Sequence, residues 1–296
     1  MTKKILVALS EHGFWIEELL LPLRHLENAG YKVDYLTPTG ALPFPDAASL
    51  DSTYVDPPLG RPVTSPEMEA LGKQQNWETL FQNRISLKDW FPVRPYLSSD
   101  NYVVSLEKYY TARTEAWKRI EEYDALLLVG GSGPIVDMVN NPRLHDLILG
   151  FYYADKPIAA ECYTVTCLAF ARELDVRKSI LSGKHCTGHT MEYDYTDGWS
   201  LWANGAYMNF GGPPFALEYI LRDAVLPDGQ FHGNVGRPTS VILDYPFITG
   251  RSVESSDLTG EILVKCLKEG LRSYGWYNPE CQCDEQDKER KLATTF

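Results

Sequence analysis

Cys162 is the residue whose surroundings point most directly to chemistry. A short apolar run at residues 157–160 predicts a buried strand, and residues 163–173 have apolar side chains at helical spacing. Cys162 therefore falls where a strand passes into a helix. The backbone N–H groups at a helix start carry partial positive charge, which favours a thiolate over a thiol. We accordingly treat Cys162 as a candidate nucleophile, with a buried, unreactive cysteine as the alternative.

Two further ionisable side chains fall where they would act on such a thiol. Glu18 lies on an expected helix, four residues before Pro22, and a carboxyl group turned toward the sheet edge would share a proton with a nearby thiol. His189 follows a strand-like stretch at residues 184–188 and is a candidate general base. His185, within that stretch, competes for the same role.

A glycine-rich turn at residues 130–133 follows another expected strand. Its N–H groups would lie near an oxyanion that develops when a thiolate attacks a substrate, while a plain tight turn is the alternative. The run lacks the G-x-G-x-x-G spacing of dinucleotide sites, and no acidic residue follows about 20 positions later at a strand end. We therefore expect no cofactor.

The elements that must position these residues alternate between strand and helix. This order predicts an α/β fold of the flavodoxin-like, doubly wound class, with a mostly parallel sheet between layers of helices. Ligands of such folds bind at the carboxyl ends of the strands, where Cys162 and the turn at 130–133 both fall. The expected strands are residues 4–9, 31–36, 124–129, 157–160, 239–244 and 247–249, and the main expected helices are 14–28, 106–122, 163–173, 213–223 and 255–270.

The domain organisation follows from shifts in composition. Residues 38–65 are rich in proline and residues 66–100 contain only weak helical stretches, so we expect 38–100 to form a Pro-rich cap insertion. The insertion belongs to a single domain spanning residues 1–275. We expect residues 276–296 to form a polar tail.

Charge and composition bound the classes of partner. The chain has 296 residues and a net charge of −12, which argues against nucleic acid and anionic membranes and favours a small-molecule substrate. No apolar run approaches the roughly 18 residues that cross a membrane, so we expect a cytoplasmic protein. The six cysteines form no secreted disulfide framework. Scattered histidines and an isolated Cys281-Gln-Cys283 in the tail predict no metal site.

Several segments, in order along the chain, resemble the ThiJ/PfpI superfamily, which is related to class I glutamine amidotransferases. The resemblance covers residues 3 to about 272. The Pro-rich segment that contains Pro43, Pro45 and Asp46 resembles the large branch with chaperone and glyoxalase-type members. The matching segments are Glu18-Leu-Leu-Leu-Pro22, Val129-Gly-Gly-Ser-Gly-Pro134, Asn141-Pro-Arg-Leu144, Lys156-Pro-Ile-Ala-Ala-Glu-Cys162, Ser182-Gly-Lys-His-Cys-Thr-Gly188 and Phe247-Ile-Thr-Gly-Arg-Ser-Val-Glu-Ser-Ser256.

The resemblance implies a role for each candidate residue. Cys162 would be the nucleophile at a strained elbow, and Glu18 would be a protonated acid hydrogen-bonded to its sulfur. His189 would match the histidine that some members place after the next strand. The N–H groups of Gly131 and Tyr163, next to Gly130, would form the oxyanion and substrate site. Members of the family are commonly dimers, so we expect a homodimer.

One departure from the family pattern affects the expected activity. The glyoxalase-type branch usually has Cys-His-Gly-Pro at the nucleophile, whereas this chain has Cys162-Tyr-Thr-Val. A general base would then have moved to His189. The aromatic residues between 191 and 210 would form either a wall over Cys162 or an interface, and Asp194 or Asp197 would orient His189.

Three functions fit these patterns. The first is a cysteine-dependent enzyme, lyase, hydrolase or hydratase in type, whose thiolate adds to an electrophilic carbon of a small molecule such as a reactive carbonyl. The second is a redox-sensing or chaperone-like stress protein that uses the same oxidisable cysteine. The third is a binding module that keeps the fold without the chemistry.

Overall fold

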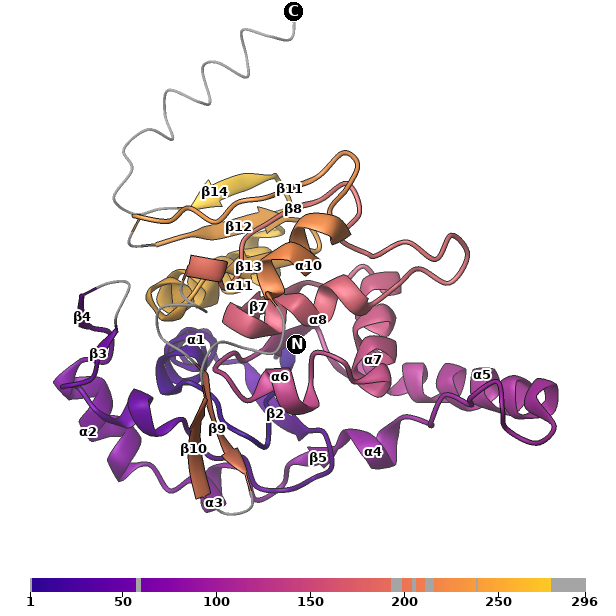
Figure 1. Cartoon of the computed structure of the whole chain (residues 1–296), viewed down its shortest axis with the longest axis horizontal. Helices are drawn as coiled ribbons and strands as arrows, with labels where there is room; N and C mark the ends of the chain where they lie inside the picture. Colours follow the sequence, from indigo (N-terminus) through magenta and orange to yellow (C-terminus); the bar gives the residue numbers. More distant parts are fainter. Residues whose placement is uncertain are drawn as a thin grey trace, which may run out of the picture.

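A mostly parallel sheet forms the centre of the molecule (Figure 1). The computed structural model describes residues 2–56, 60–192, 199–203, 206–210, 216–237 and 239–277, with the backbone alone for 199–203 and 206–210. Within these residues the sheet has eight strands in the order β14-β12-β13-β7-β6-β1-β2-β5. The strands are β1 (Lys4–Ala8), β2 (Lys32–Thr37), β5 (Ile85–Ser86), β6 (Ala125–Leu128), β7 (Ile158–Glu161), β12 (Val241–Asp244), β13 (Phe247–Gly250) and β14 (Gly275–Tyr277).

The strand order confirms the flavodoxin-like prediction. The five central strands β2, β1, β6, β7 and β13 are parallel and lie in the spatial order 2-1-3-4-5 when numbered along the chain. This is one of the two common doubly wound orders, and the direction in which successive strands are added to the sheet reverses between β1 and β6. The crevice at that reversal, beyond the carboxyl ends of the strands, is the expected place for a ligand.

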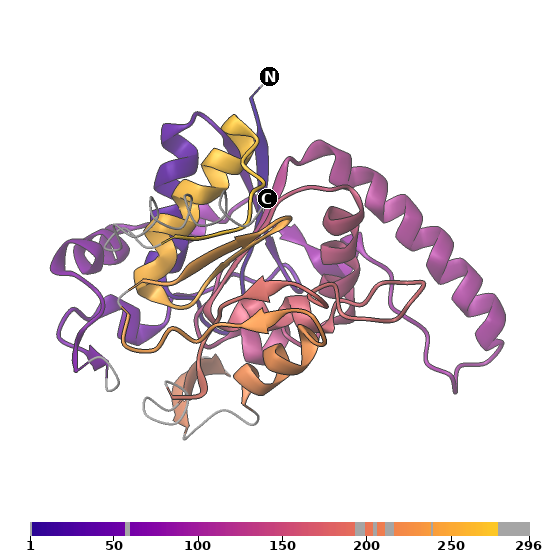
Figure 2. The same ribbon diagram turned by 90° about the horizontal axis from the view of Figure 1, so that it is seen from above.

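Helices cover both faces of the sheet (Figure 2). On one face α1 (Ile16–Asn28) and α11 (Ser256–Glu269) lie side by side. On the other face lie α7 (Pro142–Tyr153) and α8 (Val165–Phe170), with α10 (Leu217–Ala224) packed on α8. Each helix layer encloses its own apolar core against the sheet.

Strand β6 illustrates why the sheet is buried on both sides. All four of its residues, Ala-Leu-Leu-Leu, have no solvent exposure. Leu126 and Leu128 pack into the core under α7 and α8, while Ala125 and Leu127 pack into the core under α1 and α11. A parallel strand covered on both faces needs apolar residues at every position, which is the continuous run seen in the sequence.

The segment expected to be a cap is partly built into the main fold. β5 pairs in parallel with β2 at the sheet edge, and Leu87 and Phe91 enter a core cluster. Part of the expected insertion therefore covers the edge that β2 would otherwise leave free. The remaining elements of the segment are η1 (Ala47–Leu50), β3 (Val55–Asp56), β4 (Arg61–Pro62), α2 (Pro66–Gln74), α3 (Trp77–Leu80) and α4 (Leu87–Trp90).

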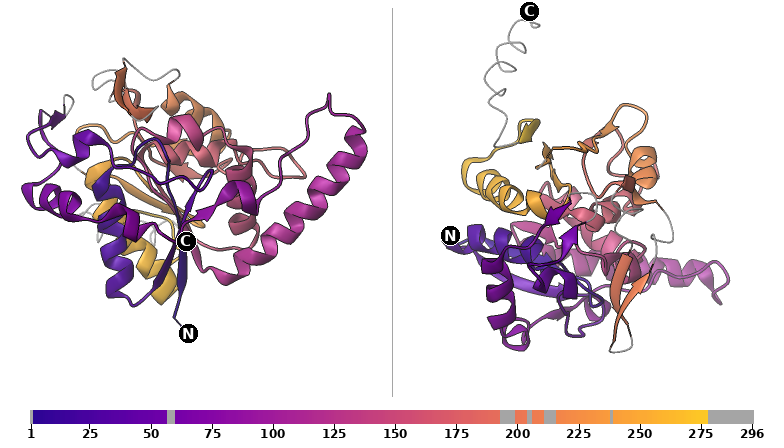
Figure 3. Two further views of the ribbon diagram at one scale, coloured as in Figure 1. Left: turned by 90° about the horizontal axis from the view of Figure 1, so that it is seen from below. Right: turned by 60° about the vertical axis from the view of Figure 1, so that its left-hand side comes forward.

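The long helix α5 (Tyr102–Lys118) projects from the body, as Figures 1 and 3 show. Two of its aromatic side chains, Tyr109 and Trp117, anchor it to α7 through Asp146. The Tyr109 hydroxyl donates to the Asp146 carboxylate, and the Trp117 indole N–H donates to the Asp146 carbonyl oxygen at 2.7 Å.

Several other boundaries differ from the sequence expectations. The helix after Cys162 ends at Phe170, and Trp276 and Tyr277, which we placed in the tail, belong to β14 because that strand pairs with β12. Residues 278–296 lie outside the described residues. The described residues also form three two-stranded sheets: β8 (His185–Cys186) with β11 (Gln230–Phe231), β9 (Trp199–Ala203) with β10 (Ala206–Phe210), and β3 with β4.

Candidate active site

Cys162 occupies a strained turn between β7 and the short helix η3 (Cys162–Thr164), which continues into α8. Its φ is +55°, a left-handed conformation that costs energy for any residue with a side chain. Thr164 holds the turn: its hydroxyl donates to the Leu128 carbonyl oxygen at 2.9 Å and accepts from the Glu161 N–H at 3.2 Å. The sulfur is therefore presented at the carboxyl edge of the sheet, with the residue 6% exposed.

Glu18 reaches the same point from α1. It has no solvent exposure, and neither of its carboxyl oxygens has a conventional N–H or O–H donor within hydrogen-bonding distance among the described residues. The Cys162 thiol is the group that acts on it as a hydrogen-bonding neighbour. Burial, followed by the charge of Glu161, raises the pKa of Glu18 well above its ordinary value.

The surroundings of the sulfur act in opposite directions. Burial, followed by the charge of Glu18, raises the pKa of the Cys162 thiol well above its ordinary value, although the backbone N–H groups of Gly131 and Tyr163, which are directed at the sulfur, act to lower it. The two N–H groups expected at an oxyanion thus lie beside the sulfur. Their role toward an oxyanion stays a prediction.

Gly130 makes the approach of Glu18 to Cys162 possible. A Cβ atom at Gly130 would lie 2.1 Å from Oε2 of Glu18 and 2.7 Å from Cβ of Cys162, closer than any side chain tolerates. Gly131 has a φ of +101°, and a Cβ there would lie 2.7 Å from the Trp15 nitrogen. The turn at 130–133 therefore needs glycine for space and conformation, which its composition alone did not reveal.

Asp46 is a buried residue to which sequence reasoning gave no role. Its carboxylate accepts from the Ser132 N–H at 3.3 Å and from the Ser132 hydroxyl at 3.3 Å, and Oδ2 lies 2.9 Å from the place where a Cβ of Gly131 would stand. It thus fixes the peptides beside the sulfur. Burial raises the pKa of Asp46 to about 7. A single acid in a Pro-rich segment carries no local signal of this contact.

Two more buried acids adjoin the pair. Burial raises the pKa of Glu161 to about 8, although hydrogen bonds from Thr259 and Ser256 lower it. Burial likewise raises the pKa of Glu17 to about 7, although its own backbone N–H and the side chains of Thr64 and Trp15 act to lower it. Negative charge on either residue raises the pKa of Glu18 further.

The two candidate histidines occupy different surroundings. His189 is 8% exposed and its ring lies against the ring of Tyr163, with 4.2 Å between centroids. His185 is hydrogen-bonded to His232, with 2.9 Å between Nδ1 and Nε2, on the small β8–β11 sheet. Burial lowers the pKa of His232 to about 4. Of the two, His189 is therefore the one that contacts the residue after Cys162.

The remaining sequence candidates fall on parts of the chain about which less is described. Asp194 and Asp197 lie outside the described residues, and the side chains of the aromatic segment from 193 to 210 are likewise not described. Within the described part of the chain, no three His, Cys, Asp or Glu side chains gather in a way that would hold a metal ion.

Comparison with known families settles the relationship that the motifs indicated. The model of the ThiJ/PfpI family-like group matches residues 9–211, more than half of the chain. The chain belongs to the ThiJ/PfpI family. The match includes Glu18, the turn at 130–133, Cys162 and His189.

Solved structures support the same fold. The 24 kDa Rapid Encystment Protein of Francisella tularensis is 18% identical, with a TM-score of 0.63 over 90% of this chain and 99% of that one. Glyoxalase III from Candida albicans is 14% identical, with a TM-score of 0.61 over 88% of this chain and 96% of that one. Among curated proteins no match is found. In the described part of the chain, no helix has both the length and the apolar character to cross a membrane.

The close approach at Gly130 gives a direct test of the site. Gly130→Ala is expected to push Glu18 or Cys162 out of position and to lower the rate of Cys162 alkylation by iodoacetamide about tenfold, an effect of about 1.4 kcal/mol. Gly233→Ala is the matched control, since its added Cβ would meet no atom closer than 3.4 Å. Equal alkylation rates in the two variants would contradict the steric account.

Glu17 predicts a pH dependence of stability. Its pKa is raised on folding from 4.5 to about 7. The contribution of Glu17 to the free energy of unfolding is therefore fully present below pH 4.5 and is lost as the pH rises through 7, by about 3 kcal/mol. Glu17→Gln removes this loss. We expect the variant to gain unfolding free energy over the native chain at pH 8 and little at pH 4, measured by urea unfolding. The exposed Glu67→Gln is the control, and an equal gain at both pH values would refute the assignment.

Proposed function

We propose that this protein is a cysteine-dependent enzyme in which the Cys162 thiolate adds to an electrophilic carbon of a small molecule. The observation that carries the proposal is the distribution of hydrogen-bond donors at the site. Two N–H groups are directed at the sulfur, while the buried carboxyl of Glu18 has no conventional donor among the described residues.

This distribution supports one arrangement of the proton. Two buried acidic groups in contact avoid carrying two negative charges, so the pair keeps one proton near neutral pH. A carboxylate without donors is poorly stabilised in a buried position, whereas a sulfur beside two N–H groups is better able to hold the charge. We therefore place the proton on Glu18, where it donates to the thiolate. With Glu18 neutral, its charge no longer raises the pKa of Cys162.

The reaction follows from that arrangement. The thiolate attacks the carbon, a C–S bond forms, and the pair of electrons from the C=O or C≡N bond moves to the substrate's oxygen or nitrogen. The N–H groups of Gly131 and Tyr163, beside Gly130, would stabilise that charge. His189, whose ring lies against that of Tyr163, would carry the proton to or from the adduct before the C–S bond breaks.

A reactive carbonyl is the substrate class we favour. A small substrate suits a sulfur with little access to solvent, since Cys162 and Tyr163 are each at most 6% exposed. The Candida albicans neighbour, a glyoxalase III, fits this class and is 14% identical to this chain. Whether the reaction is that of a lyase, a hydrolase or a hydratase depends on which substrate the enzyme takes. The homodimer and the cytoplasmic location stay predictions.

The position of the proton can be measured directly. Glu18→Leu removes the donor to the thiolate, and we expect it to raise the thiol pKa by at least about one unit, followed by thiolate absorbance in the ultraviolet. Glu18→Gln keeps an N–H donor and is expected to stay closer to the native chain. If Glu18 were ionised at rest, both variants would instead lower the thiol pKa, and the proposed arrangement would be wrong.

Turnover tests the function itself. With a panel of ketoaldehydes and aldehydes, Cys162→Ser is expected to lose at least about 10³-fold in kcat/KM, as nucleophile removal generally does. Cys167→Ser, a change at a buried cysteine one helical turn further along α8, is the matched control and should retain turnover. Full activity in Cys162→Ser would refute the proposal of a cysteine-dependent enzyme.

A redox role would use the same sulfur, and mass spectrometry distinguishes it from the enzymatic role. Under mild peroxide, a redox sensor would convert Cys162 selectively to the sulfinic acid. We expect the native chain to turn over at least one carbonyl of the panel before such oxidation and to lose that turnover in step with it. Selective oxidation without turnover of any member would favour the redox function instead.

A further inference from the structure

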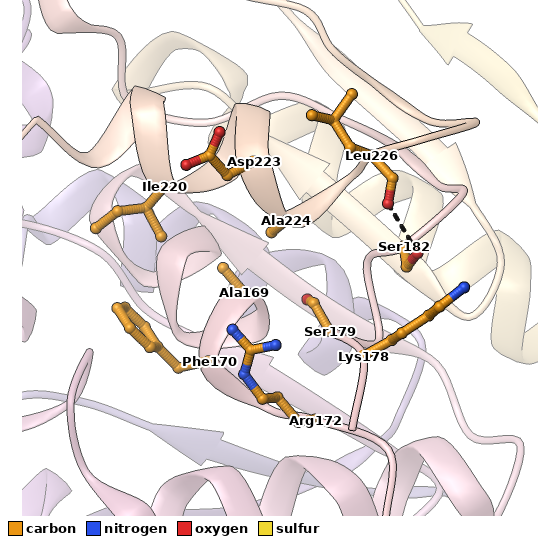
Figure 4. Close-up of a pocket in the computed structure, with 10 residues that line it drawn as sticks. All are labelled: Ala169, Phe170, Arg172, Lys178, Ser179, Ser182, Ile220, Asp223, Ala224 and Leu226. Atoms are coloured by element: carbon orange, nitrogen blue, oxygen red, sulfur yellow. Dashed lines mark hydrogen bonds between the residues drawn. The ribbon is translucent and has the colours of Figure 1, made fainter. Parts of the chain in front are cut away.

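A cavity lies beside the C-terminal end of α8 (Figure 4). It opens between the end of α8, the segment of residues 172–182 and α10, and its volume is about 320 Å³. That volume is at the lower end of the range of about 300–1,000 Å³ for small-molecule sites. Its apolar lining comes from Ala169, Phe170, Ile220 and Ala224.

The charged side chains of the cavity are not neutralised within the protein. Arg172 and Lys178 line it, and neither has a carboxylate within ion-pairing distance among the described residues. The Arg172 guanidinium donates to the Arg177 carbonyl oxygen at 3.1 Å, which holds it in place. Figure 4 shows it turned toward Ser179 and Phe170, whereas the Lys178 ammonium points away.

The polar groups on the Arg172 side are donors. The Ser179 hydroxyl accepts from the Leu181 N–H at 3.2 Å, and its own hydrogen has no acceptor among the described residues. The Ser182 hydroxyl is already used, since it donates to the Leu226 carbonyl oxygen at 2.9 Å. The guanidinium N–H groups of Arg172 and the hydroxyl hydrogen of Ser179 can thus both donate to one ligand group. The two oxygens of a carboxylate suit such a pair of donors.

The net charge of the cavity limits the ligand further. Two cations and the single carboxylate of Asp223, on the α10 side, give a local charge of +1 in a chain whose net charge is −12. A monoanion is favoured over a dianion, because Asp223 would repel a second negative charge. The apolar lining would cover an uncharged body.

We propose that this cavity binds a small monocarboxylate with an apolar body. The carboxylate lies on Arg172 and Ser179, and the body lies against Phe170, Ile220 and the small side chains of Ala169 and Ala224. This site is distinct from that of Cys162 and does not depend on the proposed function.

The two sites nevertheless share a wall. Ile220 lines the cavity and also packs against the cluster of Ile135, Cys162, Tyr163 and Leu217. A binding experiment must therefore distinguish the cavity from the surroundings of the sulfur. Prior alkylation of Cys162 does so, because it fills the space beside the sulfur and leaves the Arg172 wall unchanged.

The probe is 3-phenylpropionate, titrated by calorimetry into the full chain with Cys162 alkylated by iodoacetamide. We expect saturable binding with a Kd of about 1 mM or tighter. The uncharged 3-phenylpropionamide should bind at least about tenfold weaker, because it lacks the charge-assisted hydrogen bonds to Arg172. Arg172→Gln should weaken binding of the carboxylate by about tenfold or more.

Arg177→Gln is the matched control. It removes the same charge from the same segment and keeps the carbonyl oxygen that accepts from Arg172, yet the exposed Arg177 side chain does not line the cavity, so affinity should stay within about twofold because an exposed charge is screened by solvent and salt. Ala224→Phe fills the cavity from α10 and should abolish binding. It tests the site without changing Arg172, so the proposal stays testable if Arg172→Gln fails to fold. Each of three results would overturn the proposal. The probe fails to saturate the protein by about 10 mM, Arg172→Gln and Arg177→Gln lose the same affinity, or the probe binds only before alkylation.

Discussion

The contact between Glu18 and Cys162 is the constraint on which the candidate site depends. Two acidic groups are buried together, and a low-dielectric site disfavours charge on both. The chain meets this constraint by bringing a helix from after β1 and a turn from after β7 to one edge of the sheet. Gly130, between them, contributes by having no side chain.

The acids around this pair extend the same constraint. Glu17, Asp46 and Glu161 are buried and have raised pKa values, so each opposes a further negative charge nearby. This arrangement costs stability near neutral pH, and such costs are concentrated at functional sites. The two apolar cores on either side of the sheet supply the burial that offsets them.

The inserted segment contributes at both of its ends. Near its start, Asp46 reaches the glycine turn and holds the peptides that face the sulfur. Near its other end, β5 extends the sheet beside β2. The segment expected to form a cap insertion therefore supports both the site and the sheet edge. The monocarboxylate cavity stands outside this system, except for the wall at Ile220.

The sequence by itself determined the architecture and the central turn. Continuous apolar runs predicted the buried parallel strands, and the passage from strand to helix at Cys162 is a local pattern of neighbouring residues. The tertiary structure alone decided the roles of Asp46 and Gly130, the contact of His189 with Tyr163, the separate pairing of His185 with His232, and the addition of β14 to the sheet. Most of these depend on residues far apart in the chain, whose proximity no local spacing records. Burial, which raises the pKa of Glu18, likewise exists only once both helix layers have closed over the sheet.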